Sequence, residues 1–324
     1  MYHREYGKDF VRYHVIPMVN LRDERLHLFF QEMSADYDVS LYMKHGEFVL
    51  EVKKRKERYW VNALLFVITF MSVAFTGSMF YGSFNPLQGI EFAIAVMFVL
   101  GSHEMGHFIA SKRWRMKASL PYFIPFPTII GTLGAIIKQR GVIRSRKALL
   151  EIGISGPIAG LVASVVVTYY GLKLTPPEPV EGGGGIILGE PLLFGLIAKL
   201  AGFDGFYIHP VAFAGWVGMF VTALNLVPVG QLDGGHAMRA ILGEQADIVS
   251  RVFPLVLIGI GFLYRESGVW FFWGLVTLFF SMQKHPKPSD DSPLPLSYKI
   301  AGAITFALGA MCFTPVPFQI SEGL

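Results

Sequence analysis

Long apolar stretches, separated by short polar segments, dominate the chain from residue 60 onward. No lysine or arginine occurs from Val61 to Ser111, and the turn-forming sequence GSFNPLQG at 82–89 divides this stretch in two. Each half has about the 20 residues that a helix needs to cross roughly 30 Å of hydrocarbon. Further candidate spans lie at about residues 149–172, 210–229, 252–263, 269–282 and 300–313. The pattern therefore predicts an all-α polytopic membrane protein with about six to seven transmembrane helices.

The first 58 residues follow a different pattern, with charges scattered throughout. Here YDVSLYMK and EFVLEVKKR alternate polar and apolar positions on either side of His-Gly, which is typical of two strands joined by a tight turn. We therefore expect a small soluble α/β appendage at residues 1–58, the membrane core at 59–285, and a linker with the last transmembrane helix at 286–324.

Composition supports membrane insertion and narrows the possible partners. The chain is 52% hydrophobic and only 16% charged, against about 25% charged residues in an ordinary soluble domain. The net charge of +4 is small, and the basic residues cluster beside apolar segments, so a nucleic-acid partner is not expected. Because Cys312 is the only cysteine, a cysteine-rich metal site is excluded. Any bound metal must use His, Asp or Glu.

The basic clusters also predict an orientation. They fall before the first span, after the second, before the third and after the sixth, which places all of them on one side if the chain alternates. By the positive-inside rule that side is the cytoplasm. The expected protein is a multi-pass integral membrane protein in the lipid bilayer, with its N-terminus inside and its C-terminus, after seven spans, outside.

Polar residues interrupt the second span at HEMGH, residues 103–107. In a helix, His103 and His107 project from one face one turn apart, where both imidazoles can bind one zinc ion, and Glu104 lies beside them as a general base. His103 lies nine residues before Lys112, or roughly 13 Å below the cytoplasmic end of the span. Ionisable residues at that depth are usually functional. The alternative is a pair of histidines that only form hydrogen bonds within the bundle.

A catalytic zinc usually takes three protein ligands, so a third must come from elsewhere in the chain. Asp233 is the only acidic residue between Asp204 and Glu244, and it lies near the cytoplasmic end of the fourth span, in NLVPVGQLDGGH at 225–236. The proline and glycines of that segment are expected to break the helix and turn Asp233 inward. An acid at a span end is otherwise a solvated cap.

HEMGH, followed about 120 residues later by NLVPVGQLDGG, resembles the site-2 protease family of intramembrane zinc metalloproteases, whose patterns are H-E-x-x-H and N-x-x-P-x-x-x-x-D-G. The resemblance extends over GTLGAIIKQRGVIRSRKALLEIGISGPIAG at 131–160. It implies hydrolysis of peptide bonds within or near transmembrane segments of membrane-protein substrates. It also implies one Zn²⁺ per chain held by His103, His107 and Asp233, with Glu104 as general base and then acid. Asn225 matches the family's substrate-contacting or oxyanion-contacting Asn, although an Asn within a span is otherwise usually an interhelical hydrogen bond.

A transmembrane substrate must be locally unwound before its carbonyls can be attacked. Residues 128–138, TIIGTLGAIIK, are apolar and β-branched with glycines at bends, which suits a membrane-associated strand or hairpin with a free edge for the substrate backbone. An ordinary linker packed on the bundle is the alternative.

Two other functions remain open at this point. One is a metal or proton transporter that uses the same polar cluster; the other is a non-catalytic protein that only binds membrane helices. The complete HEMGH motif, with Glu104 present, favours the protease over the non-catalytic protein.

Overall fold

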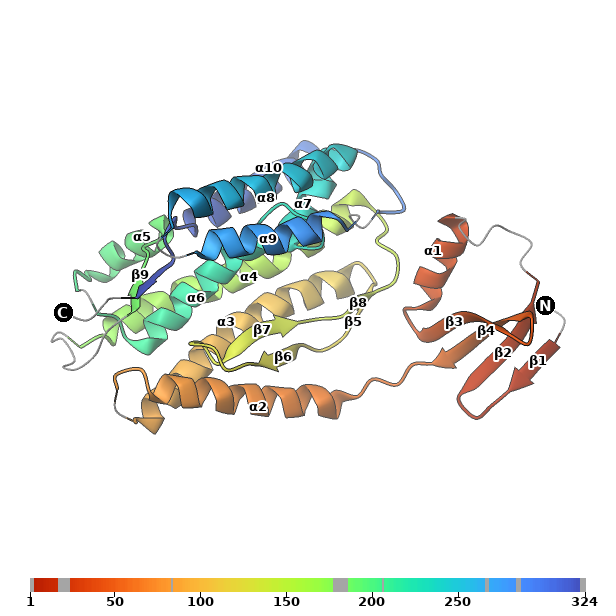
Figure 1. Cartoon of the computed structure of the whole chain (residues 1–324), viewed down its shortest axis with the longest axis horizontal. Coiled ribbons are helices and arrows are strands. Elements are labelled where there is room, and N and C mark those ends of the chain that lie inside the picture. The colour runs from red at the N-terminus through yellow and green to blue at the C-terminus, as the bar shows by residue number, and fades with distance from the viewer. Residues whose placement is uncertain are drawn as a thin grey trace.

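The computed structural model describes residues 3–16, 24–82, 84–176, 186–205, 207–265, 268–283 and 287–320. Over these residues the chain forms a bundle of roughly parallel and antiparallel helices, with a separate small sheet beyond one end of it (Figure 1). The N-terminus lies in that sheet, and the C-terminus lies at the opposite end of the bundle.

The small sheet belongs to the N-terminal segment and has the strand order β1-β2-β4-β3. Its elements are β1 (His3–Tyr6), β2 (Phe10–Val15), α1 (Glu24–Met33), β3 (Tyr37–Lys44) and β4 (Glu47–Lys54), which together we call the N-terminal unit. The predicted hairpin is confirmed as β3 and β4. Its turn residues, His45 and Gly46, both have positive φ, 50° and 84°, as a two-residue hairpin turn requires.

Four helical segments in the described residues are long and apolar enough to cross a membrane. They are α2 (Tyr59–Ser78), α3 (Pro86–Arg113), α4 (Arg146–Lys173) and the segment 233–263, which joins α7 (Asp233–Leu242), the short η1 (Gly243–Gln245) and α8 (Ala246–Leu263). Shorter apolar helices are α5 (Leu192–Ala201), α6 (Pro210–Asn225), α9 (Val269–Ser281) and α10 (Leu296–Met311).

The prediction of a mainly helical membrane protein is therefore confirmed, whereas the number of six to seven spans stays a prediction. The difference lies in helix length: α6 has 16 residues, which gives about 24 Å of helix, less than the roughly 30 Å hydrocarbon layer. The expected boundary at 285/286 between core and C-terminal segment lies outside the described residues.

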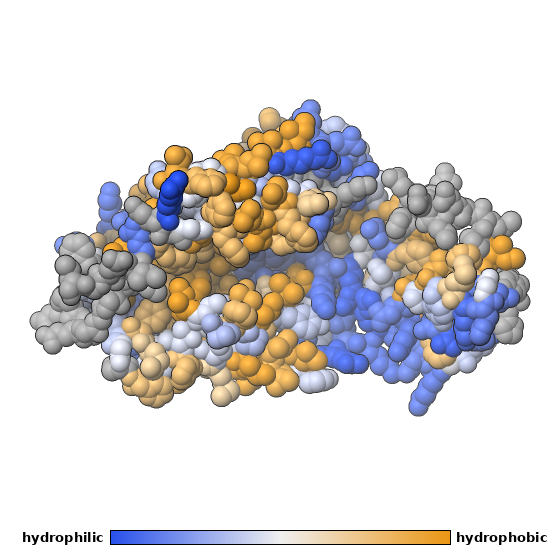
Figure 2. All heavy atoms as spheres, viewed as in Figure 1, coloured by the Kyte–Doolittle hydropathy of each residue, from blue (hydrophilic) through white to orange (hydrophobic). Residues whose placement is uncertain are grey.

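The helix α4 lies at the centre of the bundle, packed against α3, α6 and α7. Its buried residues include three glycines that face α3 and α7, namely Gly153, Gly156 and Gly160. Large apolar side chains instead cover much of the outer surface of the bundle (Figure 2). Such a surface suits lipid, because lipid removes the need to bury apolar side chains in the protein interior.

A β-hairpin and a two-residue ladder that encloses it occupy the chain between α3 and α4. Strand β6 (Tyr122–Pro125) pairs with β7 (Thr132–Ile136), and β5 (Lys117–Ala118) pairs with β8 (Gln139–Arg140). The predicted strand at 128–138 is thus found as one arm of a hairpin, which lies between α2 and α3 (Figure 1). At the opposite end of the bundle, β9 (Ile186–Leu188) pairs with β10 (Phe318–Ile320).

The α2 helix holds the β6–β7 hairpin near both of its ends. The buried Asn62 side chain donates hydrogen bonds to the carbonyls of Leu120, at 2.9 Å, and Pro121, at 3.0 Å, just before β6. The Ser72 hydroxyl donates to the carbonyl of Gly131 at 2.8 Å, at the turn before β7. Gly131 has φ of +84° and contacts the α2 backbone so closely that no side chain fits. The hairpin is therefore attached to α2 along its length.

Candidate functional site

The helix α3 supplies the first residues of the site. It begins where the Asn85 side chain accepts a hydrogen bond from the Gln88 N–H, with Pro86 in the first helical position, and it ends with Lys112 and Arg113 in its last turn. His103 and His107 lie one turn apart on its buried face, 5% and 6% exposed, with ring centroids separated by 4.9 Å.

The chain between α6 and α7 supplies the other side of the site. Asn225 is the last residue of α6, and the helix stops before Pro228, which cannot continue the backbone hydrogen-bond pattern. Asp233 then begins α7. The Gly230 N–H donates to the Ser250 hydroxyl at 3.0 Å, which ties the intervening turn to α8.

The helix break is where the sequence predicts it, but Gly234 and Gly235 do not form part of it. Both lie in the first turn of α7, and a Cβ on either would clash with backbone carbonyls of residues 226–230. Their role is therefore close packing, since α7 folds back against the end of α6. This folding directs Asp233 towards α3.

Three atoms that could bind a metal ion meet between these elements. They belong to His103, His107 and Asp233, which we call the donor cluster. The Nε2 atoms of His103 and His107 are 3.2 Å apart, and each lies 3.2 Å from Asp233 Oδ2. A tetrahedral zinc with bonds of about 2.0–2.1 Å has neighbouring ligand atoms about 3.3 Å apart. The three measured separations therefore fit one zinc ion.

A hydrogen bond on the far side of His107 fixes which ring nitrogen can bind a metal. Its Nδ1 lies 2.7 Å from the carbonyl oxygen of Ile152 in α4. Because a carbonyl only accepts, Nδ1 carries the proton, and the neutral ring then presents the lone pair of Nε2 to the donor cluster. The α4 backbone thus orients this imidazole.

Glu104 and Asn225 lie beside the donor cluster. The Asn225 amide nitrogen is 3.3 Å from His103 Nε2. Glu104 is buried at 8% exposure, and its carboxylate faces the backbone N–H of Ile137, just after β7. All five predicted site residues line one cavity of about 440 Å³, together with Met116, Ala135, Ile136, Ile137, Gln139, Gly141, Ile143, Ile152, Gln231, Leu232 and His236.

The glycines of α4 make room for the histidines. A Cβ built on Gly156 would overlap the His107 imidazole, and one on Gly160 would lie 3.0 Å from the Cβ of His103. Small residues at these positions let α3 approach α4 closely.

We expect Gly156→Ala to weaken zinc binding on the order of 10- to 100-fold, the usual effect of disturbing a group that orients a metal ligand. The added methyl displaces the His107 ring, whereas alanine favours the helix itself. Zinc content of the purified protein after dialysis against a weak chelator measures the effect. Gly259→Ala is the matched control, because a Cβ on Gly259 in α8 meets no atom within 4 Å. Full zinc retention by Gly156→Ala would contradict this packing role.

Two backbone groups of the site were not foreseen from the sequence. The carbonyl of Ile152 and the N–H of Ile137 carry no side-chain signature, and only the fold places them beside His107 and Glu104. Gly156 was the available signal for the first, because it follows Ile152 by about one helical turn and its missing side chain leaves room for the His107 ring beside that carbonyl.

Comparison with known proteins places this arrangement in a family. Residues 91–263 match the model of peptidase family M50. "Probable zinc metalloprotease EGY1, chloroplastic" of Arabidopsis thaliana is 34% identical over 246 residues, which cover 72% of this chain and 44% of that protein. "Probable zinc metalloprotease EGY2, chloroplastic" of Oryza sativa subsp. indica is 30% identical over 274 residues, 78% of this chain and 48% of that protein. No solved structure matches the chain.

The chain spans about half the length of the curated relatives it matches. The family match nevertheless covers both α3 and the start of α7, the elements that carry the donor cluster. The cofactor of the family is zinc, and the cluster of His103, His107 and Asp233 suits that metal. We conclude that the chain belongs to peptidase family M50, the family of the site-2 proteases that its two motifs resemble.

Proposed function

We propose that the protein is an intramembrane zinc metalloprotease that hydrolyses peptide bonds within or near transmembrane segments of other membrane proteins. The observation that carries the proposal is the convergence of two imidazole nitrogens and one carboxylate oxygen, 3.2 Å apart, beside the buried Glu104 carboxylate in one cavity. Family membership supports it.

The proposed roles follow from the chemistry of each side chain. His103, His107 and Asp233 hold the zinc, which, when bound, lowers the pKa of water to about 7 and polarises carbonyl oxygens. Glu104 accepts a proton from the attacking water and later donates it to the leaving amine. Asn225 donates a hydrogen bond from its amide to the oxygen on which negative charge develops.

The position of β7 supports a substrate that binds in extended form. One edge of β7 pairs with β6, and the described residues place no strand on its other edge. Ala135 and Ile136 of β7 line the cavity. An unwound substrate segment can add to that edge by backbone hydrogen bonds, which satisfies its polar groups in a water-poor site. We propose β7 as the strand that receives the substrate.

We also propose the orientation and the division of the chain. The hydrophilic surface gathers where the bundle faces the N-terminal unit (Figure 2), at the end where α3 finishes with Lys112 and Arg113. By the positive-inside rule this end, with the donor cluster, faces the cytoplasm. Residues 1–58 then form a cytoplasmic appendage, 59–285 the protease core, and 286–324 the linker and last helix, with six to seven spans in all.

Reconstitution in proteoliposomes with a single-span model substrate tests the proposal. We expect cleavage by the native protein, and a loss of at least about 100-fold when a membrane-permeant chelator removes the metal, because zinc supplies the activated water. Added Zn²⁺ should restore cleavage. A metal or proton transporter would instead move its ion across the vesicle membrane and leave the substrate intact. Cleavage that persists after verified metal removal would overturn the proposal.

A further inference from the structure

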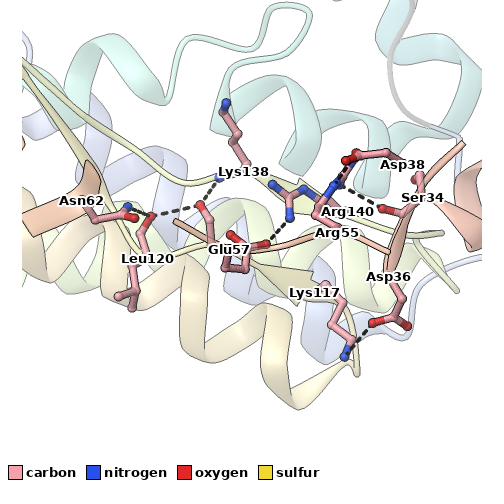
Figure 3. Close-up of polar contacts among 11 residues, drawn as sticks. Ser34, Asp36, Asp38, Arg55, Glu57, Asn62, Lys117, Leu120, Lys138 and Arg140 are labelled. Carbon is pink, nitrogen blue, oxygen red and sulfur yellow. Dashed lines mark hydrogen bonds and ion pairs between the residues drawn. The ribbon is translucent and has the colours of Figure 1, made fainter. Parts of the chain in front are cut away.

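Two ion pairs link the N-terminal part of the chain to the β5–β8 ladder. One involves the N-terminal unit itself, and the other the residues between that unit and α2. Arg140 of β8 binds the Glu57 carboxylate at 2.5 Å, and Lys117 of β5 lies 3.1 Å from Asp36 Oδ1. Figure 3 shows the Arg140 guanidinium pointing to Glu57 and the Lys117 side chain pointing to Asp36. Both cations belong to the core, and both acids precede α2.

Arg55, two residues before Glu57, contacts the loop that carries Asp36. The Arg55 guanidinium donates to the Ser34 carbonyl at 3.1 Å and pairs with Asp38, while its backbone N–H donates to the Asp36 carbonyl at 3.2 Å. The loop after α1 is thus joined to the segment that carries Glu57. Ala35 of this loop lies 3.7 Å from the position of a Cβ on Gly141.

The sequence neighbours of Arg140 and Lys117 line the proposed catalytic cavity. Gln139 and Gly141, on either side of Arg140, line the cavity wall, as does Met116 beside Lys117. Three residues before Arg140, Ile137 lines the same cavity as Glu104, and its backbone N–H faces that carboxylate. The segment 137–141 therefore contacts the N-terminal unit and its linker on one side and the general base on the other.

Within the described residues, the other contacts of this segment are with the neighbouring strands, and they include the Lys138 ammonium 5.2 Å from the centroid of the Tyr122 ring. The Lys138 N–H donates to the Ser119 hydroxyl at 2.9 Å, and the Ser119 N–H donates to the Lys138 carbonyl at 3.1 Å. The β5–β8 ladder itself pairs only residues 117–118 with 139–140. A two-residue ladder is weak by itself, so the ion pairs outside it add to what holds the segment in place.

The two ion pairs differ in solvent exposure, and this difference indicates which of them contributes more to holding the segment in place. The Arg140 and Glu57 side chains are 17% and 32% exposed, whereas Lys117 and Asp36 are 55% and 61% exposed. Exposed pairs are screened by water and salt and contribute little. The Glu57–Arg140 pair is therefore the main contact.

We propose that Glu57 and Arg140 are positioning residues: through them the N-terminal unit and its linker hold residues 135–141 against Glu104 and along the substrate-receiving edge of β7. The N-terminal unit then contributes to the protease site by keeping this segment in position. This inference rests on the proposed function for its effect on cleavage, but not for its effect on the strand itself.

Hydrogen exchange and kinetics of Glu57→Gln test the proposal. Glutamine keeps the shape and removes the charge, so the fold and the zinc content should persist. We expect amide exchange over residues 135–141 to rise about 10-fold because the segment opens more often. We expect KM for the model substrate to rise about 3- to 10-fold, with a smaller change in kcat, because the strand that receives the substrate is less ordered. Asp36→Asn should change both quantities less.

Two further variants separate positioning from general damage. The exchanged pair Glu57→Arg with Arg140→Glu should restore slow exchange and low KM, because the attraction is re-formed in reverse. Asp9→Asn is the matched control, since it breaks the exposed Lys56–Asp9 pair, 3.1 Å long, next to Glu57 but remote from the core. It should leave exchange and KM unchanged.

The outcomes distinguish the two proposals. Unchanged exchange over residues 135–141 in Glu57→Gln would overturn the positioning role, whatever the protease does. An equal loss in Asp9→Asn would also overturn it. If exchange rises as expected while even the native protein cleaves no substrate, the positioning of the strand is supported and the proposed function fails.

Discussion

Replacing Glu104 with glutamine is expected to abolish cleavage, by at least about 10³-fold in kcat, and to leave zinc bound. Glutamine has nearly the shape of glutamate but cannot accept a proton, and general acid–base catalysis contributes about 10²–10⁴-fold. The metal should remain because the donor cluster consists of His103, His107 and Asp233 and does not include Glu104. Single-turnover cleavage in proteoliposomes and zinc content of the same preparation measure the two effects.

The control for this variant lies on the same helix. Glu91, near the start of α3, has a side chain that is 42% exposed and lies 3.7 Å from His209. It precedes His103 by about three helical turns, or roughly 18 Å along the helix. Glu91→Gln removes the same charge from α3 and should cleave at the native rate. If Glu104→Gln cleaves as fast as Glu91→Gln, Glu104 is not the general base and the chemistry proposed for the cavity is wrong.

The membrane character of the fold could be read from the sequence because hydrophobic run length has a direct physical meaning in a bilayer. Helices α2, α3 and α4 begin and end within a few residues of the predicted spans. The fourth predicted span, at about 210–229, extends beyond the helix, since α6 ends at Asn225 and the apolar run continues through a turn. Hydropathy measures composition and not backbone conformation, so it does not mark where such a helix stops.

The donor cluster was accessible to sequence reasoning for two different reasons. His103 and His107 are four residues apart in one helix, so local geometry alone places them together. Asp233 was found by elimination and by resemblance, and its approach to within 3.2 Å of both imidazoles depends on how α7 folds back on α6. That packing needs Gly234 and Gly235, which the sequence indicates only as helix breakers.

Contacts between distant segments that carry no recognisable motif could not be predicted. The hairpin of β3 and β4 follows from alternation and from the His45-Gly46 turn, both of which are local. By contrast, Glu57 and Arg140 are 83 residues apart, and each belongs to a cluster of charges that offers several partners of similar strength. Only the tertiary fold selects one of them.

The arrangement explains how a polar site is maintained in an apolar bundle. Unpaired polar groups are costly in such surroundings, and here protein groups lie beside each of them: His107 has the Ile152 carbonyl, His103 has Asp233 and Asn225, and Glu104 faces the Ile137 N–H. The partners come from four separate parts of the chain. The site is therefore assembled by the whole core rather than by the motif helix alone.

Removing the third proposed ligand, by Asp233→Ala, is expected to lower zinc affinity on the order of 10³-fold and to abolish cleavage. The side chain of Asp233 is 17% exposed and contacts both imidazole nitrogens, so its loss leaves two ligands where a catalytic zinc requires three. Competition with a zinc-binding dye measures the affinity. Asp233→Glu keeps the carboxylate on a longer side chain and should recover part of the binding, which separates ligand chemistry from damage to the helix.

Thermal unfolding in detergent gives an independent measurement of the same loss. Zinc that binds only the folded protein stabilises it by about 4 kcal/mol at 1,000 times the dissociation constant. The native protein and Asp204→Ala, an exposed acid before α6, should therefore unfold at a higher temperature when Zn²⁺ is added, whereas Asp233→Ala should respond weakly or not at all. An equal zinc response in Asp233→Ala would show that the metal is held by another set of residues. In that case the meeting of α3 and α7, on which the proposed chemistry depends, would have to serve a purpose other than metal binding.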